Sequence, residues 1–301
     1  MILRISIILR RTRNIKNRFA PINRLPPETL TDIATSFAKK RDLINATAIC
    51  QHWRSVLLSF PLLWCNAAGS LSEIQAYIDR SKAAPLDVSL VRPSVVDLVI
   101  PHTCRLVGLT VRLNRSSSFN QIVERLRYPI PTLHTFRISA IDPFPHILGL
   151  PADVNDSFFL HSKKLEIKGI SAFDGPKSFP YVTDLTLSTN EYEMVQMNHF
   201  LETLEQLPSL ERVYVVFCSD MYSNTTPHMT TLPLVQTMSL SRFSKNSIIA
   251  ESLPQILGYL RLPKLTSLSV QASPQFAPFH SIYFLSYPLT NASRTSPNSP
   301  N

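Results

Sequence analysis

An apolar pattern that recurs at a nearly constant interval restricts the fold of this chain more than any other feature of its sequence. The fullest copies have three apolar residues followed by Asn or Cys: Leu106, Leu109, Val111 and Asn114; Val182, Leu185, Leu187 and Asn190; Leu210, Val213, Val215 and Cys218. The central apolar residues, termed phase marks, lie at 109, 136, 165, 185, 213, 238 and 268, at intervals of 20 to 30 residues. Such a period predicts a stack of similar units, each burying its apolar face against its neighbours.

Five prolines support this phase independently. Each lies five residues before a phase mark: Pro131, Pro180, Pro208, Pro233 and Pro263. Proline at this point ends a preceding helix or loop and favours an extended entry into the next strand. Between the marks, apolar patterns predict helices over residues 119–127, 191–207 and 252–261.

The repeated pattern resembles leucine-rich repeats in a degenerate form. The resemblance implies that residues 101–273 form an irregular solenoid of parallel strands with helices and loops, an α/β architecture. It also implies that the Asn or Cys after a strand is buried and hydrogen-bonds backbone groups in the following turn. An ordinary α/β domain with irregular spacing remains the alternative.

Three short amphipathic segments precede the repeats, over residues 21–65. The first opens with Pro26 and Pro27, which suit the first turn of a helix. The second follows Asp42, a suitable N-cap, and the third carries Trp53 and Leu57 on one face. Three helices in about 40 residues form a core too small for high stability alone. This predicts that their exposed apolar side chains need a partner.

The order of residues in this segment resembles the F-box, most closely that of F-box proteins of mushroom-forming fungi: Leu25-Pro26-Pro27-Glu28, Leu30, Ile33, Asp42-Leu43, Cys50, Trp53-Arg54, Leu57, Pro61 and Trp64. In that family three helices bind a Skp-family adaptor, which bridges to a cullin–RING ligase. The resemblance assigns adaptor binding to Leu25, Pro26, Pro27, Leu30, Ile33 and Leu43, and packing of the module to Cys50, Trp53, Leu57 and Trp64. One position departs: Ala34 stands where a large residue is usual, which weakens the expected contact unless Phe37 compensates.

Residues 66–100 are expected to connect the helical module to the repeats. Ser70 and Glu73 have the spacing of a capping box, which predicts a helix that ends near Arg80. Apolar residues then alternate as in a first strand, at Leu86, Val88 and Leu90.

The basic character of the chain is concentrated at its start. Of the net charge of +9, residues 1–27 carry +7 and the remaining residues +2. We interpret residues 1–20 as a disordered basic leader, with mitochondrial targeting as the alternative. Its apolar run is shorter than the roughly 20 residues of a membrane span. Residues 274–301 form an atypical aromatic tail, interpreted as a shortened array or a gene sequence that reads through a splice boundary.

No catalytic, phosphate-binding or metal-binding motif occurs in the sequence. The cysteines form no C-x-x-C pair, which predicts a reduced, intracellular protein without structural zinc. Glu202 and Glu205 are interpreted as the exposed face of a helix. Lys163 and Lys164 are followed at once by Glu166 and have no interleaved aromatic residues, so nucleic-acid binding is not expected.

These observations together predict a non-catalytic substrate-recognition subunit of a Skp–cullin–F-box ubiquitin ligase. Its expected partners are the Skp-family adaptor, through it a cullin–RING ligase, and an unknown protein substrate on the repeats. No cofactor, metal, nucleic acid or membrane is expected, and the expected compartment is the cytoplasm, the nucleus or both. The alternative is a leucine-rich-repeat interaction protein that has lost ligase docking.

Overall fold

The computed structural model describes residues 21–37, 40–113, 121–122, 124–126, 129–140, 147–149, 161–169, 172–174, 179–189, 195–218, 221–222, 226–244 and 256–274. The chain divides into two compact units. Unit 1 comprises residues 1–89 and 105–107, and unit 2 comprises residues 90–104 and 108–301. The basic leader, the aromatic tail beyond Pro274, Asn114 and Asn190 lie outside the described residues.

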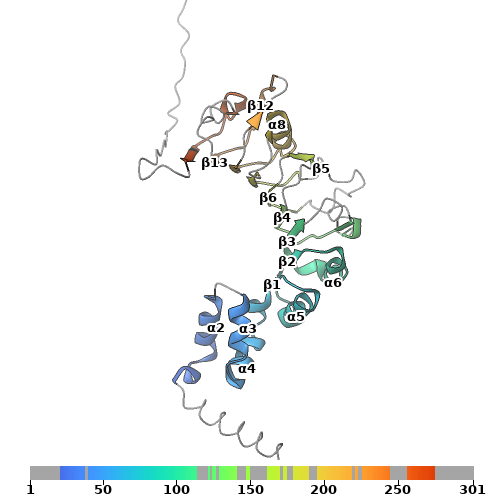
Figure 1. The fold of residues 1–301 in the computed structure, drawn as a ribbon, viewed down its shortest axis with the longest axis vertical. Coiled ribbons are helices and arrows are strands. Elements are labelled where there is room, and N and C mark those ends of the chain that lie inside the picture. Colours follow the sequence, from blue (N-terminus) through green and yellow to red (C-terminus); the bar gives the residue numbers. More distant parts are fainter. Residues whose placement is uncertain are drawn as a thin grey trace, which may run out of the picture. The chain divides into compact units, whose positions relative to one another are not determined.

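The first part of unit 1 contains the three predicted helices, α2 (Pro27–Thr35), α3 (Lys40–Thr47) and α4 (Gln51–Ser59), preceded by η1 (Pro21–Arg24) and followed by η2 (Pro61–Trp64) (Figure 1). Helix α4 packs against both α2 and α3. Each helix contributes one apolar face to the shared core, which contains Leu30, Ala34, Leu43, Ala46, Trp53, Val56 and Leu57.

The second part of unit 1 consists of β1 (Asn66–Ala67), α5 (Leu71–Ser81) and β2 (Leu86–Leu90), and β1 pairs with β2 in parallel. The predicted capping box is present, because the Ser70 side chain accepts a bond from the Glu73 amide while the Glu73 carboxylate accepts one from the Ser70 amide. At the other end of α5, the Arg105 guanidinium donates to the carbonyls of Ile78 and Ala84, each at 3.1 Å. Both ends of α5 are therefore stabilised by side chains.

Trp64 joins the two parts of unit 1. Its side chain is fully buried, and its Nε1 donates to the Leu57 carbonyl at 2.9 Å. The indole makes an edge contact with Tyr77, with ring centroids 5.3 Å apart, and the Arg80 guanidinium lies 4.4 Å from its ring. One residue thus connects α4, η2 and α5.

The first elements of unit 2 are η3 (Pro93–Val95), α6 (Val96–Val99) and all of η4 (Ile100–Arg105) except Arg105, and the chain then builds a parallel sheet. Successive strands along the chain are neighbours in the sheet, in the order β3 (Leu106–Leu113), β4 (Thr135–Ala140), β6 (Lys164–Lys168), β8 (Asp184–Ser188), β10 (Arg212–Phe217), β13 (Thr237–Ser244) and β15 (Ser267–Pro274). Helices and a mostly parallel sheet give the α/β architecture that was expected.

The register of this sheet confirms the predicted phase. Each phase mark is paired with the next across the sheet, in one continuous row: Leu109, Phe136, Leu165, Leu185, Val213, Met238 and Leu268. The first six of these side chains are completely buried. Burial of alternate residues therefore accounts for the alignment of the first six strands.

Five strands of this sheet, β4, β8, β10, β13 and β15, are each entered through a turn that contains one of the five prolines. In four of these turns an amide donates to the carbonyl three residues earlier, with proline second in the turn: Leu133 to Ile130, Val182 to Phe179, Leu210 to Leu207, and Leu265 to Leu262. Proline suits this position because its fixed φ matches the turn. Four of the five prolines thus lie in hydrogen-bonded β-turns, which is more specific than the predicted role of ending a helix or loop.

A second backbone feature recurs between neighbouring repeats of the sheet. The carbonyl two residues before a phase mark accepts hydrogen bonds from two successive amides of the following repeat. This occurs at His134, Lys163, Thr183, Glu211 and Gln236, with distances of 2.8 to 3.1 Å. Such close repetition shows that these repeats share one backbone conformation where the strand begins.

The connections between the main strands form a second layer. They include α8 (Met197–Glu205) and three parallel pairs, β5 (Ile147–Gly149) with β7 (Ala172–Asp174), β9 (Val195–Gln196) with β11 (Met221–Tyr222), and β12 (Thr230–Thr231) with β14 (Leu260–Arg261). Phe200 of α8 meets Phe217 of β10 with ring centroids 5.6 Å apart, so α8 packs on the apolar side of the sheet. On the opposite side of the sheet, the described side chains are exposed or half-buried.

Two helix predictions need correction at their ends. The expected 252–261 helix is helical only at 256–258 among its described residues, and Leu260–Arg261 form β14 instead, because they pair with β12. The expected 191–207 helix is described from Met197, after β9. Its predicted exposed face is correct, since Glu202 and Glu205 are exposed.

Candidate protein-interaction surfaces

The first candidate surface lies on the helical module of unit 1. Of the residues expected to bind an adaptor, Pro26 and Pro27 are exposed, and Leu25 and Ile33 are half-buried. Leu30 is completely buried and Leu43 is nearly so, because both face the core of their own module. Any part that these two leucines have in adaptor binding is therefore indirect, through the packing of α2 and α3.

Four large apolar side chains remain exposed on this module: Ile22, Ile44, Ile49 and Leu62. Ile49 and Leu62 are 57% and 72% exposed, which is unusual for a core-forming residue type. A contact of 3.7 Å between Cys50 Sγ and Asn23 Oδ1 holds η1 beside the start of α4. Ile22 and Ile49, the residues just before these two, therefore lie on adjoining segments.

The residues expected to pack the module lie mainly inside it. Trp53, Leu57 and Trp64 are buried, and Cys50 is half-buried. Ala34 is also buried, so the position that is large in F-box proteins contributes only a methyl group to this core. The prediction that Ala34 weakens an adaptor contact remains to be measured.

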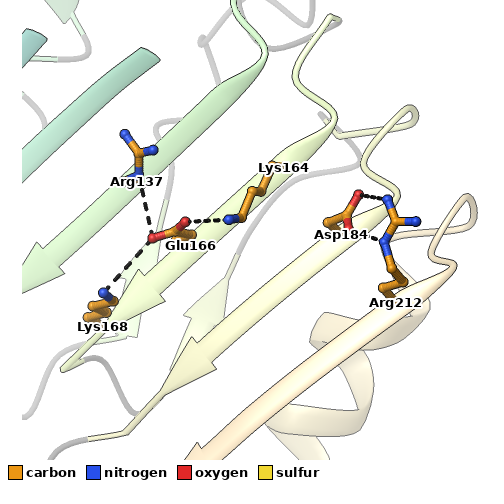
Figure 2. Close-up of polar contacts among 6 residues, drawn as sticks. All are labelled: Arg137, Lys164, Glu166, Lys168, Asp184 and Arg212. Carbon is orange, nitrogen blue, oxygen red and sulfur yellow. Dashed lines mark hydrogen bonds and ion pairs between the residues drawn. The ribbon is translucent and has the colours of Figure 1, made fainter. Parts of the chain in front are cut away.

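The second candidate surface is the outward face of the sheet in unit 2. Figure 2 shows Glu166 on β6 between Lys164 and Lys168 of the same strand and Arg137 of β4. Its carboxylate lies 2.9 Å from Lys164, 3.5 Å from Arg137 and 3.9 Å from Lys168. Burial raises the pKa of Glu166, but the hydrogen bond from Lys164 and the three positive charges outweigh it and lower that pKa overall.

A separate ion pair joins the next two strands. Arg212 of β10 donates through Nε and Nη2 to both carboxylate oxygens of Asp184 on β8 (Figure 2). This fork, together with a bond from the Thr183 hydroxyl at 2.7 Å, holds the pKa of Asp184 below its usual value despite partial burial. Such a two-point arrangement fixes the orientation of both side chains.

A shallow pocket lies beside the Glu166 cluster. It is lined by Thr110, Arg112, Arg137, Ile138, Ser139, Glu166 and Lys168, from β3, β4 and β6. Three cationic side chains therefore face one carboxylate. Towards the other end of the sheet the outward positions are uncharged, and most carry hydroxyls: Thr237, Ser239, Ser241, Ser267, Ser269 and Gln271.

Sequence reasoning did not identify this pocket. Lys164 and Glu166 were noticed, but Arg112 and Arg137 are distant in sequence and join them only through the strand register. The available signal was the spacing from the phase marks, because residues one and three positions after each mark face outward together. Aligning those positions across the repeats would have shown the positive charge.

Other chemistry has little support in the described part of the chain. No group of His, Cys, Asp and Glu there is arranged to hold a metal ion. No helix among the same residues is long and apolar enough to cross a membrane. Cys218 is half-buried, and its backbone amide donates to the Thr189 hydroxyl at 2.9 Å, so here a threonine side chain bonds the turn after the strand.

Comparison of the chain with protein-family models and with curated proteins gives no match to either. The case for a function therefore depends on the two surfaces described above.

Proposed function

We propose that this chain is a non-catalytic substrate-recognition subunit of a Skp–cullin–F-box ubiquitin ligase, with the helical module docking to a Skp-family adaptor and the repeats holding the target. The observation that carries the proposal is the helical module itself. It buries a small core and still leaves Ile22, Ile44, Ile49 and Leu62 exposed. Burying one such side chain in an interface contributes about 1.5 to 3 kcal/mol, which favours a protein partner over solvent.

The resemblance to the F-box supplies the identity of that partner. Pro26 and Pro27, which the resemblance assigns to the adaptor contact, are exposed at the start of α2. They are rigid and need little ordering on binding, which reduces the entropic cost of the complex. The module thus offers both preformed backbone and exposed apolar groups.

The repeats suit the second part of the proposal. Parallel strands in sequence order present a long polar face, which is suited to holding an extended protein segment. The role of the whole chain would then be proximity, because a tethered target has a raised effective concentration at the ubiquitin-carrying enzyme.

The proposal is tested by binding of the purified full chain to a purified Skp-family adaptor, measured by calorimetry. We expect binding that is weakened at least tenfold by Pro26→Ala with Ile49→Ala, because both remove exposed groups and leave the core intact. Leu71→Ala is the matched control, since Leu71 is also exposed, at 48%, but lies at the start of α5.

Absence of adaptor binding by the folded chain would reject the proposal and favour a repeat protein that has lost ligase docking. An equal loss of adaptor affinity in Leu71→Ala and in the double variant would also count against the proposal, because adaptor binding would then not depend on the helical module.

A further inference from the structure

The pocket on the outward face of the sheet has a local excess of positive charge. Arg112, Arg137 and Lys168 line it, while Glu166 is the one acid among its lining residues. Glu166 is already shared among Arg137, Lys164 and Lys168. Glu166 forms no ion pair with Arg112, so the Arg112 guanidinium retains an attraction for a second anion.

Arg112 is the cation of the pocket that is most available to an anion. Its side chain is exposed on β3, and it forms no ion pair with any residue that the structure describes. Two hydroxyls, of Thr110 and Ser139, stand beside it in the pocket. A guanidinium with neighbouring hydroxyls matches the geometry of a carboxylate, which accepts two parallel bonds from arginine and further bonds from hydroxyls.

We infer that the pocket formed by Thr110, Arg112, Arg137, Ser139 and Lys168 binds a carboxylate side chain of an acidic, Asp- or Glu-rich segment in the target protein. This inference rests on the proposed function, in which the sheet holds the target. It specifies the chemistry of the segment that the sheet would select.

The surroundings of the pocket favour an acidic peptide over a nucleic acid. Glu166 stands inside the pocket, so a carboxylate side chain would approach on the Arg112 side. Nucleic-acid grooves also use aromatic side chains for base stacking. Among the described outward positions of β3, β4, β6, β8 and β10, the one aromatic side chain is Tyr214, on β10, which is separated from β6 by β8.

The rest of the outward face is compatible with an extended peptide. Beyond the Asp184–Arg212 pair, β13 and β15 present mainly hydroxyl groups. Such groups both donate and accept hydrogen bonds, so they can satisfy peptide backbone groups of either kind. The pocket would then anchor one acidic end of the target segment and fix its direction across the strands.

The inference is tested by fluorescence anisotropy with the full chain and a fluorescein-labelled hexaglutamate peptide. We expect saturable binding that weakens as salt is raised from 0.05 to 0.5 M, because salt screens exposed charges. Arg112→Ala with Lys168→Ala is expected to weaken binding about tenfold, as two exposed ion pairs are lost. Glu166→Gln is expected to tighten it roughly threefold, because a repelling charge is removed.

The Glu166→Gln result is the most informative, because a variant that merely unfolds cannot bind more tightly. Arg261→Ala with Lys264→Ala is the matched control for charge. It also removes two exposed cations from unit 2, but at the turn and short strand that precede β15. This control should bind like the unaltered chain.

Several outcomes would overturn the inference. They are the absence of binding, an equal loss in the control double variant, and binding retained by Arg112→Ala with Lys168→Ala, which would place the peptide elsewhere, such as on the basic leader. Stronger competition by a single-stranded RNA oligomer, or by inorganic phosphate, than by unlabelled hexaglutamate would also overturn it. Adaptor binding measured on the same pocket variants separates the two proposals, because it should be unchanged by them.

Discussion

The two tryptophans of this chain offer a direct test of the packing described for unit 1. Both are buried, but only Trp64 has a bonded indole, donating to the Leu57 carbonyl at 2.9 Å. The Nε1 of Trp53 has no hydrogen-bond partner in the described part of the chain. Replacement of each by Phe removes a similar amount of apolar packing, so the difference between the two variants isolates the polar contacts.

The expected difference follows from the contacts of Trp64. The lost bond to Leu57 contributes about 1 kcal/mol to the free energy of unfolding. The cation–π contact between the Arg80 guanidinium and the indole, at 4.4 Å, contributes roughly 0.5 kcal/mol less when the weaker partner Phe replaces Trp64. Trp64→Phe should therefore destabilise unit 1 by about 1.5 kcal/mol more than Trp53→Phe.

The assay is urea unfolding followed by fluorescence. The chain has two tryptophans, both in unit 1, so each variant keeps one reporter in the same unit. With a slope of about 1 to 2 kcal/mol per M, the two midpoints should differ by roughly 1 M. Equal midpoints, or a lower midpoint for Trp53→Phe, would refute the assignment of Trp64 as the bonded residue that joins α4 to α5.

Three further predictions concern other polar contacts and one turn. Arg105→Ala should destabilise unit 1 by roughly 2 kcal/mol, because it removes the cation that bonds the carbonyls ending α5; an unchanged fluorescence midpoint in urea would contradict this. Gly69→Ala should cost about 1 kcal/mol or more in the same assay, since its φ of 123° is unfavourable for other residues and the new methyl would meet the Glu73 carboxylate. Asp184→Asn should lower the thermal stability seen by circular dichroism at neutral pH. Arg212 lowers the pKa of Asp184 in the folded chain. The stability that Asp184 contributes is therefore complete above its unfolded pKa of about 3.9 and is lost as the pH falls through the lower folded pKa. A stability difference between the two chains that stays constant down to about pH 2 would contradict this prediction.

Sequence reasoning located the strands well because burial fixes them. Residues at each phase mark and two positions later must both face the core, and this spacing of two leaves one register for neighbouring strands. The capping box of α5 was also predicted correctly, since Ser70 and Glu73 bond within one helical turn. These features depend on local spacing, which a sequence displays directly.

The features that were missed depend on contacts between distant segments. Leu260–Arg261 were expected in a helix because their apolar spacing is helical, but pairing with β12 makes them a strand. Leu30 and Leu43 face the core of their own module, which a resemblance alone does not reveal, and their part in adaptor binding stays a prediction. Arg112 and Arg137 meet the Glu166 cluster only after strands β3, β4 and β6 are aligned.

The proline turns and the shared carbonyls have a consequence for how such a chain can change over generations. The repeats entered through Pro131, Pro180 and Pro208 share this turn, and each offers the same acceptor carbonyl to the repeat that follows. A stretch running from one proline to the next could therefore be duplicated or deleted without altering the junctions on either side. The number of units and the chemistry displayed on each strand are free to diverge separately, so new binding preferences need not disturb the inherited frame.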